Sequence, residues 1–280
     1  MFEVRGLHFG TAGVPLASPK PSSVEGIKTV RQLGLDAMEL EFVRGVRMSD
    51  RLAEEVRRVS SELNVLLTAH APYYINLNSP DESKVEASVR RIMDTARAAH
   101  KCGGWSIVFH PAYYGDDDPS TVHERVKRAL RRVVEGLRDE GVEVWVRPET
   151  AGGLAEYGNL HEVVALSQEV EGVLPCIDFA HIHARTNGAY NTYDEIASIF
   201  TLLEKELGEE CLKNMHMHFS GIEYSERGEV KHVNLEESDY NYEALARALR
   251  DFNVEGVIIS ESPNIEGDAL LLKRAYESLK

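Results

Sequence analysis

The stretch Leu174-Pro-Cys-Ile-Asp-Phe-Ala-His-Ile-His183 places an acid and two imidazoles directly after a short apolar run. Such a run is typical of a buried strand, and Asp178, His181 and His183 follow where that strand would give way to a loop. Acid and imidazole groups at a buried strand end are costly without partners, and a divalent metal supplies a partner for all of them. A lone Asp-x-x-His pair is more often an ordinary hydrogen-bonded pair, so the metal hypothesis depends on how the other strands end.

The same unit, a short apolar run followed by a helical pattern, repeats along the chain with no linker or low-complexity break. Eight such units predict a (β/α)8 TIM barrel of parallel strands, and we expect residues 1–280 to form one domain. The predicted strands are 6–10, 37–43, 65–69, 105–109, 142–146, the run ending at 178, 215–219 and 256–260. The predicted helices are 22–34, 50–63, 80–101, 120–140, 160–170, one beginning near 193, 240–251 and 266–279.

Potential metal ligands follow six of the eight predicted strands. In a TIM barrel the active site lies at the C-terminal ends of the strands, so polar residues at those ends indicate chemistry. His216 and His218 share one face of a strand, and His218 is preferred because it lies nearer the C-terminal end. His183 lies further from the strand and ranks behind its neighbours. The candidate ligands are His70, His110, Glu149, Asp178, His181, His218, His232 and Glu261.

This set of side chains exceeds what one tetrahedral zinc ion needs. It predicts two metals that share a bridging carboxylate, with room for a third. A metal pair about 3.5–4 Å apart activates a bridging hydroxide and clamps the attacking and leaving oxygens of a phosphodiester. Ligation rich in histidine favours Zn²⁺ or Mn²⁺ over Mg²⁺, which prefers oxygen donors. The chemistry predicted from the residues is therefore hydrolytic.

Charge and cysteine usage limit the classes of protein to consider. The formal net charge of −15 opposes broad attraction to polyanions, although a locally basic or metal-lined groove can still bind phosphate. Cys102, Cys176 and Cys211 are widely spaced and predict core thiols, not disulfides or a zinc ribbon. No apolar run is long enough to cross a bilayer, and residues 1–10 lack a signal-peptide pattern. We expect a cytoplasmic protein that is a monomer.

Several motifs resemble, in order and spacing, those of the endonuclease IV family of apurinic/apyrimidinic endonucleases. The resemblance runs from about residue 70 to residue 261, and the chain has the family's length. The His-x-x-Tyr-x-Ile-Asn-Leu and Cys-Ile-Asp-x-x-His elements are fairly specific, whereas the single histidines are not. The motifs are His70-Ala-Pro-Tyr-Tyr-Ile-Asn-Leu77, Phe109-His110-Pro111, Glu149-Thr-Ala-Gly152, Cys176-Ile-Asp178-Phe-Ala-His181, the strand end at His218, and Glu261-Ser-Pro263.

The resemblance implies a xylose-isomerase-like barrel with three zinc ions. The implied activity is hydrolysis of the DNA backbone 5′ to an abasic site, which leaves a 3′-hydroxyl and serves DNA repair. The implied ligand sets are His70 and His110 with bridging Glu149; Asp178, His218 and Glu261; and His181 with His232.

The resemblance also implies abasic-site duplex DNA as the partner. Tyr73 and Tyr74 match the residues that the family wedges into the duplex, and Arg44 or Arg47 lies in the loop that supplies an inserted arginine. Filling the space left by an extruded nucleotide would offset the lost stacking. From the residues alone, packing of the two tyrosines over the barrel mouth is as good an interpretation as stacking on a base or sugar.

One motif departs from the family pattern. The family reads Asp-Arg-His at the third metal, whereas this chain reads Val230-Lys231-His232. Glu229 is adjacent, but in an extended segment it would face the other way from His232. We therefore expect a third metal site that has lost its carboxylate and is weak, empty or differently ligated.

Two other functions stay open on the residues alone. Related xylose-isomerase-like sugar isomerases and epimerases use the same fold, and in them a carboxylate pair moves a proton beside a metal-polarised carbonyl. Here that catalytic pair would be Glu149 and Glu261, and the negative net charge suits a neutral sugar. The other alternative is a degenerate barrel that binds metal without catalysis.

Overall fold

A computed structural model describes residues 3–279 of the chain. Within these residues, eight parallel strands lie in the order β6-β4-β3-β2-β1-β12-β9-β8. Isolated parallel bridges join Val146 to Val173 and Glu149 to Cys176, so the barrel is nearly closed between β6 and β8. The TIM barrel prediction is confirmed. The strands are β1 (Leu7–Ala12), β2 (Ala37–Glu41), β3 (Leu66–His70), β4 (Ser106–Phe109), β6 (Trp145–Pro148), β8 (Cys176–Asp178), β9 (Met215–Phe219) and β12 (Gly256–Ser260).

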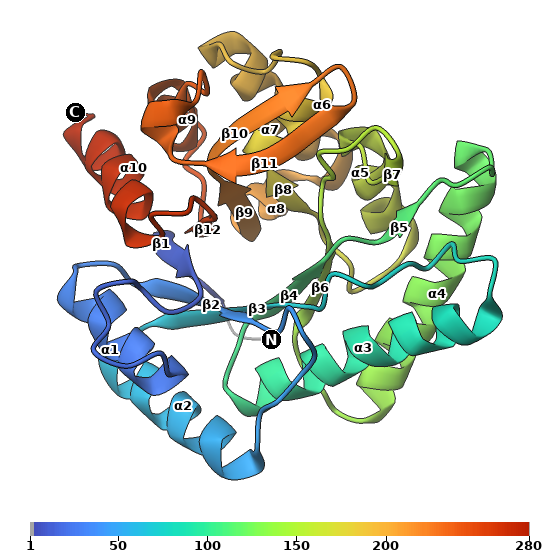
Figure 1. Cartoon of the computed structure of the whole chain (residues 1–280), viewed down its shortest axis with the longest axis horizontal. Helices are drawn as coiled ribbons and strands as arrows, with labels where there is room; N and C mark the ends of the chain where they lie inside the picture. The colour runs from blue at the N-terminus through green and yellow to red at the C-terminus, as the bar shows by residue number, and fades with distance from the viewer. Residues whose placement is uncertain (1–2, 280) are drawn as a thin grey trace.

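Helices surround the strands, as Figure 1 shows. Polar side chains cap the helices: Ser49 accepts a hydrogen bond from the Leu52 amide, and Asn159 forms a capping box with Glu162. The helix bounds agree with the predictions to within a few residues. They are α1 (Ser23–Gln32), α2 (Asp50–Leu63), α3 (Glu82–Lys101), α4 (Pro119–Asp139), α5 (Leu160–Glu169), α7 (Tyr193–Leu207), α8 (Glu209–Leu212), α9 (Tyr242–Asp251) and α10 (Glu266–Ser278).

Two segments differ from the predicted loops. Asp178 caps a short helix, α6 (Phe179–Arg185), by accepting a 2.7 Å hydrogen bond from the His181 amide, so β8 passes directly into a helix. The segment after β9 forms a hairpin of β10 (Gly221–Ser225) and β11 (Gly228–Val233), followed by a 3₁₀ turn, η1 (Leu235–Glu237). Figure 1 shows this orange hairpin beside α6. A smaller ribbon pairs β5 (Ala112–Tyr113) with β7 (Glu156–Tyr157).

The main apolar core lies between the barrel and its helices, and a smaller apolar cluster of Ala37, Trp105, Val257 and Ile259 is formed by alternate strand positions. Apolar side chains of the helices, such as Ile27, Val56 and Leu130, are fully buried. Buried acids and imidazoles instead belong to strand residues, among them Glu39 and His216. The three cysteines are buried and free, as predicted. No helix of the described chain is both long and apolar enough to span a membrane.

Candidate metal centre

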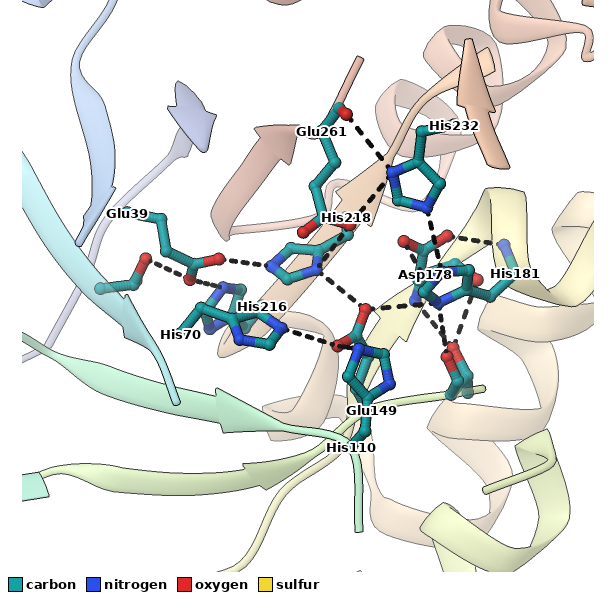
Figure 2. Close-up of polar contacts among 12 residues, drawn as sticks. Glu39, His70, His110, Glu149, Asp178, His181, His216, His218, His232 and Glu261 are labelled. Atoms are coloured by element: carbon teal, nitrogen blue, oxygen red, sulfur yellow. Dashed lines mark hydrogen bonds and ion pairs between the residues drawn. The ribbon is translucent and has the colours of Figure 1, made fainter. Parts of the chain in front are cut away.

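The first ligand set forms where β3, β4 and β6 end. His70 Nε2 and His110 Nε2 each lie 3.4 Å from Glu149 Oε2. Figure 2 labels the three residues. His70 Nδ1 lies 2.7 Å from the Ala71 carbonyl oxygen, to which it donates when Nε2 carries the lone pair. Two atoms bound about 2.0–2.1 Å from one tetrahedral ion are roughly 3.4 Å apart. The spacing therefore suits a metal held by these three residues.

The second set shares Glu149 with the first. His218 Nδ1 lies 3.0 Å from Glu149 Oε1 and 3.5 Å from Glu261 Oε2. Asp178 completes the set, since one ligand atom from each of the four residues lies within 4.8 Å of the others. Glu149 Oε2 thus faces the first set and Glu149 Oε1 faces the second, which is the arrangement of a bridging carboxylate (Figure 2).

The third set contains a carboxylate that the sequence motif did not indicate. His181 Nε2 lies 3.1 Å from His232 Nε2 and 3.1 Å from Glu229 Oε2. The other oxygen of Glu229 lies 3.4 Å from His232 Nε2. His181 Nδ1 lies 2.9 Å from the Thr150 carbonyl, so a proton there leaves Nε2 free to bind a metal.

A β-bulge explains why Glu229 faces this set. The register of β10 and β11 shifts at Val230, which is the extra residue of the bulge and is 55% exposed. His232 lies opposite Ile222 and Glu229 lies opposite Tyr224. Because positions 222 and 224 share one face of β10, both partners point to the same side. The prediction that Glu229 faces the other way is wrong, and so is the prediction that the third set lacks a carboxylate.

Burial and opposite charges shift pKa values throughout the centre. Burial raises the pKa of Asp178 to about 6. Burial also opposes ionisation of Glu149, but His110 and other imidazoles lower its pKa well below the usual value. Burial opposes the charge of His70, yet the neighbouring carboxylates of Glu149 and Glu41 raise its pKa to about 10. Imidazoles of the metal-free protein therefore hold protons that a bound metal would displace.

Several buried polar atoms support a fit to metal ions. Among the described residues, His70 Nε2, Glu149 Oε2 and Asp178 Oδ2 have no hydrogen-bond partner. A buried polar atom without a partner is costly, and a bound cation would remove that cost for all three. The donor set, with several imidazoles and carboxylates, suits Zn²⁺ or Mn²⁺.

A cavity of about 310 Å³ opens onto the three sets. Tyr73 forms part of its wall, with its ring centroid 5.3 Å from that of His70. Tyr73 and Tyr74 are each 53% exposed, and Arg44 and Arg47 are exposed on the loop after β2. A residue not predicted from the sequence, Arg91, lies over the Tyr74 ring at 5.1 Å from its centroid.

Two acids on β2 also went unrecognised in the sequence. Glu39 is fully buried against His216 and His218, and burial raises the pKa of Glu41 to about 8. An alternating Glu-Leu-Glu strand carries no spacing signal for a metal site, because its partners lie on distant strands. His183 lies outside the three sets, with Nε2 3.1 Å from Asp239, in agreement with its lower rank.

The fold and the strand-end site define a class of protein that a family comparison also identifies. A family model described as Xylose isomerase-like TIM barrel matches residues 27–280. The chain belongs to this family.

Two proteins with similar sequences show which members of the family this chain resembles. An uncharacterized protein of Methanocaldococcus jannaschii is 42% identical over 273 residues, which cover 98% of each chain. A probable endonuclease 4 of Mycoplasma pneumoniae is 24% identical over 204 residues, 71% of this chain and 68% of that protein.

Solved structures agree on the fold. Endonuclease IV from Thermus thermophilus superposes with a TM-score of 0.72 at 23% identity, covering 96% of this chain and 98% of that one. A D-tagatose 3-epimerase-like protein superposes with a TM-score of 0.68 at 18% identity, covering 95% and 96%. The resemblance to endonuclease IV predicted from the motifs is thus confirmed, and the fold is shared with sugar epimerases as well.

Proposed function

We propose that the protein is a zinc-dependent endodeoxyribonuclease that hydrolyses the DNA backbone 5′ to abasic sites and acts in DNA repair. The observation that carries the proposal is the third ligand set, in which His181, Glu229 and His232 meet beside the other two sets. Proton transfer beside a polarised carbonyl needs a carboxylate pair and a metal. Phosphodiester hydrolysis gains from several cations that cover both the attacking and the leaving oxygen. A third set of ligands therefore favours phosphodiester chemistry.

Glu149 and Glu261 would have different roles in holding the metal ions. Bound zinc would lower the pKa of water at the centre and neutralise the charge of the phosphate. Glu149 would bridge the first two sets, because its two oxygens face them separately. Burial opposes ionisation of Glu261, but the charge of His218 lowers its pKa to about 2. Glu261 would therefore act as a charged ligand at the cavity wall and not as a proton donor.

The loops around the cavity supply surfaces for DNA. Tyr73 and Tyr74 are half exposed at the mouth, where aromatic rings can replace the stacking lost when a nucleotide leaves the duplex. Arg44 and Arg47 are exposed and have no ion-pair partner among the described residues, so both are free to contact phosphate. This local positive charge would work against the overall charge of −15.

A second candidate is a metal-dependent sugar isomerase or epimerase. The observation in its favour is the approach of Glu149 and Glu261 to the same nitrogen of His218, which puts a carboxylate pair beside one metal position. The shared fold with a D-tagatose 3-epimerase-like protein is compatible with it. A barrel that binds metal without catalysis is the third candidate.

Cleavage of a defined duplex separates these functions. Protein stripped with a chelator would be reloaded with zinc, manganese or cobalt and incubated with a duplex that carries one tetrahydrofuran abasic analogue. We expect a nick 5′ to the analogue whose 3′-hydroxyl a polymerase can extend. No nick with any metal, together with interconversion of ketoses, would overturn the nuclease in favour of the isomerase. If the protein binds metal but shows no turnover in either assay, the non-catalytic metal-binding barrel is the remaining candidate.

Metal content is measured on the same preparations. We expect two to three zinc ions per chain, with manganese as a substitute. Protein that retains no metal after loading would contradict every one of these functions. Residence in the cytoplasm, a monomeric state and a single domain over residues 1–280 stay predictions.

A further inference from the structure

A buried carboxylate contacts His218 from the side opposite the metal centre. Glu39 is fully buried in the barrel interior, and its Oε1 lies 2.9 Å from His218 Nε2. The other edge of the ring carries Nδ1, which lies 3.0 Å from Glu149 and 3.5 Å from Glu261. Figure 2 shows the imidazole standing between Glu39 and the carboxylates of the centre.

Glu39 is itself held from several strands. Its Oε2 accepts a 2.7 Å hydrogen bond from Thr68 Oγ1 on β3 and lies 3.0 Å from His216 Nε2 on β9. The other nitrogen of His216 lies 2.6 Å from Ser106 Oγ on β4. A hydroxyl that donates to His216 Nδ1, with the imidazole proton on Nε2, suits both contacts of that ring. The Glu39 carboxylate therefore has a defined position in the barrel.

This position determines which nitrogen of His218 is free. A neutral imidazole that binds metal through Nδ1 must carry its proton on Nε2, and the group beside Nε2 decides how stable that form is. Glu39 Oε1 lies 2.9 Å from Nε2. A carboxylate oxygen at this distance accepts a proton donated by Nε2 and makes Nδ1 a better electron donor.

We propose that Glu39 is a positioning residue, which holds His218 in the Nε2-protonated form with Nδ1 directed at the second ligand set. The inference rests on metal binding by that set, which is part of the proposed function, but it does not depend on DNA as the substrate. It also explains why an acid is tolerated at the centre of β2, where a buried carboxylate without partners would be destabilising.

Metal titration of Glu39→Gln tests the proposal without any assay of turnover. Chelator-stripped protein would be titrated with Co²⁺ and Zn²⁺, and each ligand set should give one phase of the binding curve. The phase that depends on His218 is the one lost in His218→Ala. We expect the metal affinity of that phase to fall about 10–100-fold in Glu39→Gln, as is typical when a partner of a ligand histidine is removed. The phases of the other two sets should keep their affinities.

A double-mutant cycle separates positioning from a general structural effect. If Glu39 acts only through His218, Glu39→Gln leaves the two metal-binding phases that remain in a His218→Ala background unchanged. The matched control is Thr95→Val, which removes a fully buried hydroxyl that donates to the Arg91 carbonyl within α3 and should leave the titration unchanged. If Glu39→Gln does not fold, Glu39→Asp keeps the charge but shortens its reach, and the same selective loss is expected.

The outcomes distinguish this inference from the function on which it rests. Wild-type protein without a His218-dependent phase would contradict the proposed metal centre itself. A wild-type phase that is equally strong in Glu39→Gln would overturn only the role of Glu39. Equal weakening of all phases, or equal weakening by Thr95→Val, would assign Glu39 to barrel stability and would also overturn it.

Discussion

Glu229 Oε2 lies 3.1 Å from His181 Nε2, which joins the β10–β11 hairpin to helix α6 at the edge of the metal centre. The contact depends on the bulge at Val230, because regular alternation along β11 would turn Glu229 away from His232. The acid has moved by one position in the sequence relative to the family motif while its carboxylate still reaches the ligand set. Backbone geometry therefore compensates for the Val230 departure.

Removal of this acid should remove a metal. We expect Glu229→Gln to weaken metal binding at the third set about 10–100-fold, because a neutral amide is a poorer ligand and does not balance the charge of the metal ion. Metal analysis and competition with a chromophoric chelator measure the change. The control is Glu223→Gln, since Glu223 pairs with Lys231 on the opposite face of the same hairpin. Full retention of three metals in Glu229→Gln would contradict the ligand assignment.

Restoring the family motif should not rescue the site. Val230 is 55% exposed and lies on the bulge, so an aspartate there would point to solvent. We expect Glu229→Ala with Val230→Asp to bind as little metal at the third set as Glu229→Ala alone. Recovery of that metal in the double variant would show that the hairpin changes register, contrary to this expectation.

Glu149→Gln should abolish turnover whatever the substrate. The carboxylate faces two ligand sets at once, so its loss disturbs both. We expect a decrease of at least about 10²–10⁴-fold in the rate of strand cleavage or ketose interconversion. Initial rates at saturating metal measure it. Glu169→Gln serves as the control, because that acid pairs with Lys127 away from the centre and its loss should leave the rate unchanged.

Metal affinity should rise with pH over a defined range. Burial opposes protonation of His70, but Glu149 and Glu41 raise its pKa to about 10, so the metal-free protein holds this proton at pH 7. Each displaced proton makes the apparent affinity increase about tenfold per pH unit below that pKa. Chelator competition at pH 6, 7, 8 and 9 gives the slope. His70→Gln should reduce the slope by one proton, and an unchanged slope would exclude His70 as its source.

The same proton should affect the stability of the metal-free protein. A pKa raised from about 6.5 in the unfolded chain gives a stabilising contribution that is complete below about pH 6.5 and is lost as the pH rises through about 10. Urea unfolding of chelator-treated wild type across this range should therefore show a decreasing free energy of unfolding. His70→Gln should show a smaller decrease, and an identical decrease would assign the effect to other groups.

The exposed tyrosines should contribute to DNA binding and not to metal binding. Tyr73→Ala and Tyr74→Ala remove rings that can stack, an effect worth about 1–3 kcal/mol per ring in single-strand complexes. We expect weaker binding to abasic duplex in a fluorescence assay with an unchanged metal content. Tyr242→Ala, on α9 and not among the residues that line the cavity, is the control. Normal binding by both tyrosine variants would favour packing over the barrel mouth as their only role.

The two arginines should determine part of the salt dependence. Replacing Arg44 or Arg47 with alanine should weaken binding similarly for all DNA sequences and reduce the slope of log affinity against log salt by about 1 for each lost phosphate contact. Titrations between low and moderate salt measure the slope. Arg138→Ala, on α4 near Glu171, should leave it unaltered. Slopes equal to wild type in both loop variants would exclude these residues from the interface.

The amino-acid sequence was sufficient for the barrel and for most of the candidate ligands. Apolar runs ending in His70, His110, Glu149 or His218 could be recognised because each strand and its first polar residue are adjacent in the chain. In a parallel barrel all these ends meet at one face, so local patterns translate into a common site without knowledge of distances. The assignment of Asp178 and Glu261 to the same face followed from the same argument.

Only the tertiary structure decided the remaining details. Whether Glu229 faces His181 depends on a one-residue bulge, and a bulge changes the face of a side chain without a distinct sequence signal here. Glu39 meets His218 across the barrel, and β1 and β12 lie between their strands in the sheet, so no spacing in the chain connects them. Local patterns determine which residues reach the barrel mouth, whereas register and packing determine which atoms face one another.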